Sequence, residues 1–208
     1  RTQFPDHPDI ACIEGRALMR ASPERQDLRR ADAAFRSAHE LKCKRPELFD
    51  LWMEAKRSLK DWIGLAKVAE LANKRSVSSS GVWNFAIAHR EMGENARRQG
   101  DLSSAAEYYK KGATSIRDAF ESNNATGRVK ELMELKSDLG RAYVDTVNRQ
   151  HGAEGASLEV WLACFDAFEM HVRTEPIVLL GLQRLTDWWR TVEQIGRASC
   201  RERVCHRV

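Results

Sequence analysis

Histidine and cysteine are the side chains most able to do chemistry in this sequence, and one pair has a suggestive spacing. His39 precedes Cys43 by four residues, which on a helix would place a base and a thiol on the same face. A nucleophilic cysteine also needs a pocket and a depressed pKa, and the surrounding sequence indicates neither. We therefore interpret both residues as structural.

Metal and cofactor sites are not indicated either. His89-Arg90-Glu91 does not have the HExxH spacing of a zinc site, and the glycines occur singly and not in a phosphate-binding loop. The five cysteines form no CxxC pair, which is typical of reduced thiols in a cytoplasmic protein. The sequence thus predicts no catalytic, cofactor-binding or metal-ligating residue and no enzymatic activity.

Apolar residues recur at three- and four-residue steps over most of the chain, which predicts amphipathic helices. Four residues are predicted N-caps: Ser22, Asp61, Asp101 and Ser157. Breaks are predicted at residues 76–81, at Gly100, at residues 122–124 and at residues 151–156. These signals predict about nine helices, and neighbours joined by such short connections pack antiparallel.

Prolines at similar places indicate that the helices come in repeated pairs. Pro8, Pro46 and Pro176 each open a predicted helix and are followed by aliphatic residues. We divide the chain into five helix pairs, at about residues 8–45, 46–81, 82–127, 128–175 and 176–195. One pair cannot bury its own apolar face, so the pairs are expected to stack.

The third pair resembles a tetratricopeptide repeat. The matching residues are Gly93, where two helices pack closely, Gly100-Asp101 in the turn, and Ala105 and Tyr109 on the second helix. In the fourth pair, Leu139-Gly140 and Tyr143 match the first helix. Gly112 departs from the family, which usually has alanine there, and the third and fourth pairs are longer than its 34-residue frame. The repeats are therefore degenerate, and a HEAT-like helical array is the alternative.

The resemblance implies an all-α domain at residues 1–195, folded as a right-handed α-solenoid of stacked antiparallel helix pairs. It also implies a scaffold that binds a protein or peptide, because the first helices of tetratricopeptide pairs line a concave groove for such segments. Carried over through Gly93 and Gly140, the partner-binding residues are Arg90, Glu94, Arg97, Arg98, Arg141 and Asp145. In the second pair the same positions hold Glu47, Asp50, Glu54, Arg57 and Ser58.

Three arginines in this set, Arg90, Arg97 and Arg98, fall within two turns of one helix. This spacing predicts an acidic segment in the partner. A nucleic-acid partner is not expected, because the net charge of +4 is concentrated at the end of the chain. Residues 196–208 account for +3 of it, show no helical period, resemble translated adapter sequence, and are treated as a non-native or disordered tail.

Two further function classes are consistent with the sequence. The helical region could regulate a catalytic NTPase or signalling domain elsewhere in a longer, bacterial protein, of which this chain would be a fragment. A nucleic-acid-binding helical repeat is the other alternative. The sequence predicts no membrane helix, since no apolar run approaches the ~18 residues required. It indicates no oligomeric state.

Overall fold

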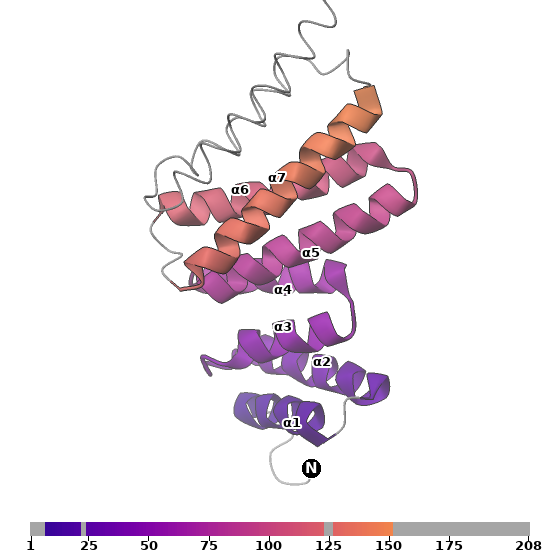
Figure 1. Cartoon of the computed structure of the whole chain (residues 1–208). Helices are drawn as coiled ribbons and strands as arrows, with labels where there is room; N and C mark the ends of the chain where they lie inside the picture. Colours follow the sequence, from indigo (N-terminus) through magenta and orange to yellow (C-terminus); the bar gives the residue numbers. More distant parts are fainter. Residues whose placement is uncertain (1–6, 22–23, 123–126, 152–208) are drawn as a thin grey trace, which may run out of the picture. The chain divides into compact units, whose positions relative to one another are not determined.

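The computed structural model describes residues 7–21, 24–122 and 127–151, all within a compact unit of residues 1–164. These residues form helices and no strand (Figure 1). The helices are α1 (Pro8–Ala21), α2 (Arg25–Glu40), α3 (Leu48–Ser58), α4 (Trp62–Arg75), α5 (Ser79–Arg98), α6 (Leu102–Glu121) and α7 (Val129–His151). The all-α prediction is confirmed for this part of the chain. The helices predicted from Ser157 and Pro176, the fifth pair and the tail lie outside the described residues.

Two predicted N-caps are confirmed. Asp61 Oδ1 accepts a hydrogen bond from Gly64 N at 2.9 Å, and Asp101 Oδ1 accepts one from Ser104 N at 3.0 Å. Gly100, just before the second cap, has φ +81°, a left-handed conformation that glycine adopts without steric cost. The turn between α5 and α6 therefore forms at the predicted place.

Two predicted helix starts are wrong. The N-cap position of α2 is Glu24 and not Ser22, so the helix begins later than expected. The break predicted at residues 76–81 is too long, because Ser78 Oγ accepts a hydrogen bond from Gly81 N at 3.0 Å and α5 begins at Ser79. A run of serines looks like a loop, yet one of them is a helix cap.

The shared helix face predicted for His39 and Cys43 is also wrong. α2 ends at Glu40, Lys42 has a left-handed φ of 61°, and Cys43 lies in the connection to α3. His39 packs on the rings of Phe49 and Trp52, with centroid distances of 5.5 and 5.8 Å. The two residues therefore have different neighbours, since Cys43 Sγ donates to Asp9 Oδ1.

Consecutive helices pack on one another, and the contacts between them are antiparallel. On the α5–α6 pair, for example, Gly93 lies against Tyr109, and His89 lies against Gly112. The odd-numbered helices also contact one another, as α1 with α3, α3 with α5, and α5 with α7. Among the described helices, α2 and α4 make no such contact, and neither do α4 and α6. The odd-numbered helices therefore lie closer to one another than the even-numbered helices do.

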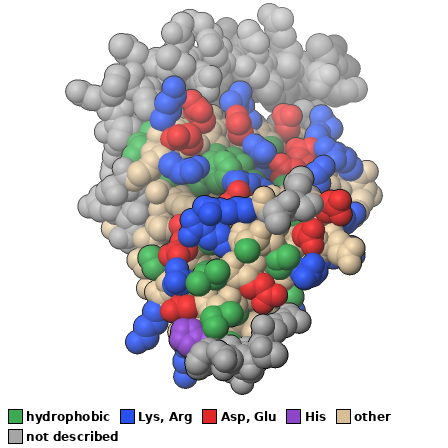
Figure 2. All heavy atoms as spheres, turned by 90° about the horizontal axis from the view of Figure 1, so that it is seen from below, with side chains coloured by type: hydrophobic (Ala, Val, Ile, Leu, Met, Phe, Trp, Pro, Cys, Tyr) green, Lys and Arg blue, Asp and Glu red, His purple; other side chains and the backbone are tan. Residues whose placement is uncertain are grey.

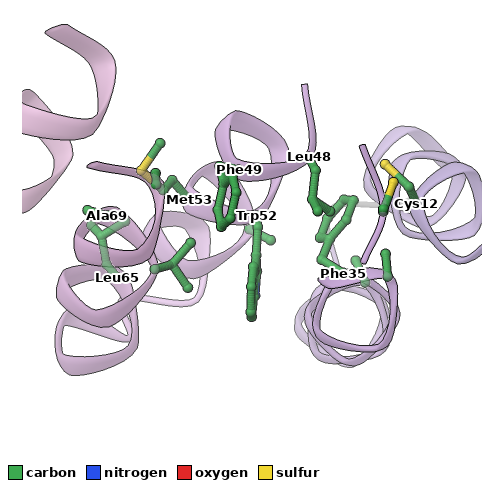
Figure 3. Close-up of a cluster of buried hydrophobic side chains, with 14 of the residues drawn as sticks. Cys12, Phe35, Leu48, Phe49, Trp52, Met53, Leu65 and Ala69 are labelled. Carbon is green, nitrogen blue, oxygen red and sulfur yellow. The ribbon is translucent and has the colours of Figure 1, made fainter. Parts of the chain in front are cut away.

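The first hydrophobic cluster joins α1 to α4 and is drawn in Figure 3. Phe35, Leu48, Met53 and Leu65 are its large, fully buried side chains. Gly15 allows α1 to approach α2, because a Cβ there would lie 2.6 Å from Phe35 Cε1. Each such side chain contributes roughly 1.5–3 kcal/mol by its burial.

A second cluster joins α5, α6 and α7. Tyr109, Ile116, Leu132 and Leu139 are fully buried in it. Gly93 has the same role here as Gly15, since a Cβ on Gly93 would lie 2.5 Å from Tyr109 Cε1. The small residue that the sequence placed at this crossing is therefore required by the packing.

Candidate functional site

Most of the partner-binding residues predicted on α5 are tied to their neighbours. Arg90 Nη2 lies 2.8 Å from Glu91 Oε1, and Arg97 Nη2 lies 2.8 Å from Glu94 Oε2. Arg98 is exposed in the last turn of α5. A paired charge attracts an external acid less than an isolated charge does. The α5 cluster is therefore less basic than its sequence indicates.

Glu94 has a structural role in the α5–α6 pair. The Tyr109 hydroxyl donates to Glu94 Oε1 at 2.7 Å, and Arg97 donates to the other carboxylate oxygen. Burial alone would raise the pKa of Glu94, but the hydrogen bonds from Arg97 and Tyr109 outweigh it and lower the pKa. Burial, and then the nearby Glu94, raises the pKa of Tyr109, whose hydroxyl stays protonated. Contact of Glu94 with a partner stays a prediction.

The two residues predicted on α7, Arg141 and Asp145, are exposed. Arg141 Nη2 lies 2.8 Å from Asp138 Oδ1 on its own helix. α7 packs against α5, so the two predicted groups lie on neighbouring helices. Within the described residues, no hydrogen bond or ion pair joins one group to the other.

A hollow of about 400 Å³ lies between α1 and α3, on the odd-numbered series. Its α3 side contains Glu47 and Glu54, two positions that the sequence assigned to the groove. Its α1 side contains Arg16 and Arg20, so acidic and basic groups face one another. Figure 2, which views the molecule from below, likewise shows acidic and basic side chains interleaved with apolar ones. Among the residues that line this hollow, two glutamates balance two arginines, so the hollow is not the extended basic patch that a nucleic-acid backbone requires.

A larger hollow, of about 830 Å³, lies on the other side and was not predicted. We call it the α4–α6 groove, because α4 and α6 form its walls and α5 its floor. α4 and α6 each pack on α5 and do not contact each other. The separation of these two walls leaves the intervening face of α5 open.

The floor of the α4–α6 groove is aromatic and apolar. Phe85, His89 and Met92 lie on one face of α5, and the rings of Phe85 and His89 are 4.1 Å apart. Tyr108 on α6 approaches His89 edge-on at 6.1 Å. On the α4 wall, Ile63 is 62% exposed, although large aliphatic side chains favour burial.

His89 is only 6% exposed and is held by α5 itself. Its Nδ1 lies 2.9 Å from the Phe85 carbonyl oxygen, which can only accept, so Nδ1 carries the proton. Burial lowers the pKa of His89, the Phe85 carbonyl opposes that shift, and the Lys111 charge adds to it. In the neutral ring Nε2 is consequently a hydrogen-bond acceptor on a groove-lining side chain.

The charged residues at the groove rims fall into two groups. The three acids have basic partners: Glu70 pairs with Lys74, Glu107 with Lys111, and Asp118 with Arg117. Lys67 on α4 and Lys110 on α6 are exposed and form no ion pair within the part of the chain that the structure describes. Each rim therefore has one exposed lysine without an ion pair among the described residues, although the lining as a whole holds three lysines and three acids.

Sequence reasoning missed this groove because its walls come from different helix pairs. α4 ends the second pair, whereas α5 and α6 form the third. The available signal was weak, because Ile63 lies outside the α4 core face, whereas Phe85 and Met92 on α5 also pack against the first hydrophobic cluster. Such residues can be recognised as the lining of a groove only when the positions of the three helices are known.

Two buried cysteines also meet unexpectedly. Cys12 on α1 and Cys43 in the α2–α3 connection interact through their thiols, and Cys43 Sγ donates to Asp9 Oδ1 at 3.4 Å. Burial, and then Cys43, raises the pKa of Cys12 to about 11. A thiol that stays protonated at neutral pH is a poor nucleophile, so its burial makes Cys12 less reactive than an exposed cysteine.

No three His, Cys, Asp or Glu side chains gather as a metal site within residues 7–21, 24–122 and 127–151. None of the helices described is long and apolar enough to cross a membrane. No protein-family model matches this chain, and no curated protein matches it.

Proposed function

We propose that this chain is a protein-binding module of the tetratricopeptide type, with its helix pairs stacked as a right-handed α-solenoid, and that it catalyses no reaction. The observation that carries the proposal is the alternation of contacts. Odd-numbered helices contact one another, whereas α2, α4 and α6 do not. In a stack of helix pairs, first helices that lie closer than second helices produce one inner and one outer face, and such faces bind extended partners.

The packing at the α5–α6 pair supports the resemblance to this family. Gly93 allows the close crossing with Tyr109, Gly100 makes the left-handed turn, and Asp101 caps α6. These are the residues through which the sequence resembles a tetratricopeptide repeat.

The hollows support a binding role. The α1–α3 hollow lies on the odd-numbered side and contains Glu47 and Glu54, as the family groove would. Arg97 and Arg98 on α5, with Arg141 on α7, remain the proposed contacts for an acidic partner segment. A cytoplasmic setting, in which Cys12 and Cys43 stay reduced, belongs to the same proposal.

The proposal is tested by selecting peptides from a random 16-residue phage-displayed library on the immobilised 208-residue chain. The selected peptides are then synthesised and titrated in solution. We expect saturable binding with a Kd at least about tenfold below 1 mM. A Kd of 1 mM itself corresponds to a binding free energy of roughly −4 kcal/mol. Each peptide is next tested against the Arg97→Glu, Arg98→Glu double variant to find the face it uses. If every selected peptide binds more weakly than 1 mM, the proposed function is wrong.

A further inference from the structure

The α4–α6 groove has the form of a seat for one more helix. Two helices that pack on a third without touching each other leave a channel over the middle one. Phe85, His89 and Met92 repeat along its floor at spacings of four and three residues, the period of a helix face. A helix laid over α5 would contact these side chains and both walls, at the interaxial distance of roughly 8–10 Å usual for packed helices.

An extended peptide is a poor occupant of this channel. α4, α5 and α6 offer no strand edge, because their backbone groups bond within the helices, so an added strand cannot pair with them. The floor side chains are apolar except for His89, and Ser115 on the α6 side already donates its hydroxyl to the Gly112 carbonyl. An extended backbone buried there would lack hydrogen-bond partners, whereas a helix satisfies its own.

The charge of the groove specifies the flanks of such a helix. Lys67 and Lys110, which have no ion pair among the described residues, stand on opposite rims. Acidic residues on both sides of an apolar stripe would match them. His89 is the one polar side chain of the floor, and with its proton on Nδ1 its Nε2 can accept, so the stripe includes one donor, a serine hydroxyl.

We propose that the α4–α6 groove binds a single amphipathic helix of a partner protein, whose apolar stripe lies on Phe85 and Met92 and whose acidic flanks face Lys67 and Lys110. This rests on the proposed protein-binding function and assigns it a surface other than the one that the family resemblance implies.

The test uses two synthetic, fluorescein-labelled 18-residue peptides. Both have leucine at helical spacing with one central serine, and one has glutamate at every flanking position, whereas the other has lysine. Fluorescence anisotropy with the whole chain, at about 0.15 M salt where surface charges act over ~8 Å, measures each affinity. We expect the glutamate peptide to bind at least about tenfold more tightly, a difference of ~1.4 kcal/mol. Equal affinities would overturn the proposal.

Reversing a charge at the groove rim tests the same proposal more specifically. Lys110→Glu should weaken the glutamate peptide and strengthen the lysine peptide, because the exchange restores complementary charges. Lys130→Glu, an exposed lysine on α7 that does not line the groove, is the matched control and should change neither affinity more than about twofold. If Lys110→Glu leaves both affinities unchanged, the assignment of the rim is wrong.

The apolar contact is tested by a variant in the groove and a control variant outside it. Ile63→Glu places a charge on the α4 wall and should weaken the glutamate peptide at least tenfold. Leu71→Glu changes an exposed residue of the same helix that is outside the groove, and it should leave binding intact. Circular dichroism shows whether both variants keep the wild-type helix content. If both weaken binding equally, the groove is not the site.

Two other outcomes separate this inference from the proposed function. If library-selected peptides respond to Arg97→Glu, Arg98→Glu but not to Ile63→Glu, the module binds proteins and the groove assignment fails. If sedimentation shows a dimer that Ile63→Glu dissociates, a second copy of this chain occupies the groove and the partner helix is excluded.

Discussion

Lys56 in the α2–α4 region and Lys136 in the α6–α7 region are both buried, at 6% and 3% exposed, but their surroundings differ. Lys56 Nζ lies 3.0 Å from Asp32 Oδ2 and 2.7 Å from Asp61 Oδ2. Trp52 Nε1 donates to the other oxygen of Asp32 at 2.6 Å. This network ties α2, α3 and the cap of α4 together.

Lys136 has no such network among the described residues, where its buried Nζ has no hydrogen-bond partner. Burial lowers the pKa of Lys136 to about 8, and the Arg117 charge adds to the shift. For Lys56, burial also acts to lower the pKa, but the hydrogen bonds to Asp61 and Asp32 outweigh it and the pKa is raised. The same residue type at similar depth therefore stabilises one region and destabilises the other, according to its partners.

The largest effect is expected from Lys56→Met. Removing the ammonium leaves Asp32, a half-buried carboxylate, with the exposed Arg36 at 3.5 Å as its remaining counter-charge. Loss of the buried partner costs about 3 kcal/mol of unfolding free energy. Urea denaturation measures it. Lys74→Met removes an exposed lysine paired with Glu70 and should cost less than about 0.5 kcal/mol. A Lys56→Met cost no larger than that of the control would contradict the role of the network.

Lys136→Met should act in the opposite direction. At pH 7 the folded chain holds a charge that the interior disfavours, so its removal is expected to stabilise by about 2–3 kcal/mol, from a depression of roughly two pKa units. The gain should shrink as pH rises from 8 towards 10, because between the folded and unfolded pKa values the unfolded wild type binds more protons. Urea denaturation at pH 7 and pH 9.5 tests both statements. A destabilised variant would show that Lys136 has a partner.

A third comparison concerns the space around two glycines, Gly93 and Gly112. Gly93→Ala puts a Cβ 2.5 Å from the buried Tyr109 ring, and we expect a net loss of about 1 kcal/mol after the gain in helix propensity. At Gly112, where the tetratricopeptide family usually has alanine, the Cβ would meet the two Leu139 methyl groups at 3.0 and 3.3 Å and His89 Cβ at 3.3 Å, all farther away than the Tyr109 ring is at Gly93. Gly112→Ala should therefore be close to neutral. Thermal unfolding of the two variants measures the stability that each loses. Equal losses of stability would show that both crossings are equally tight.

The smallest effect concerns His89, the third buried base. Its pKa is lowered by burial, so below the unfolded value of about 6.5 the unfolded chain binds more protons and stability falls. Between pH 7 and pH 6 the loss is expected to reach at most about 0.7 kcal/mol. The contribution of His89 is measured by comparing the urea unfolding midpoints of the wild type and of His89→Gln at pH 7 and pH 6. A variant that keeps the full pH slope would place the titrating group elsewhere.

The local features of the fold were predicted well because their causes are local. Asp61 and Asp101 cap helices through bonds to amides three residues away, and Gly100 makes its turn alone. Where prediction failed, the deciding contact was less visible: Ser78 is a cap inside a run that resembles a loop. The partner-binding residues were assigned by resemblance, and the structure shows that Glu94 and Arg97 also serve the α5–α6 packing.

By itself the sequence determined the helical character of the chain and the positions of most described helices, because helix period, caps and turns depend on residues within a few positions of each other. The close crossing at Gly93 was implied by the family resemblance. Tertiary structure alone decided which charges are paired between different helices. Lys56 meets Asp32 from 24 residues away, and Lys67 and Lys110 flank one groove only because α4 and α6 both pack on α5. Electrostatic and packing energies depend on distance in space, and no local pattern encodes the distance between separate helices.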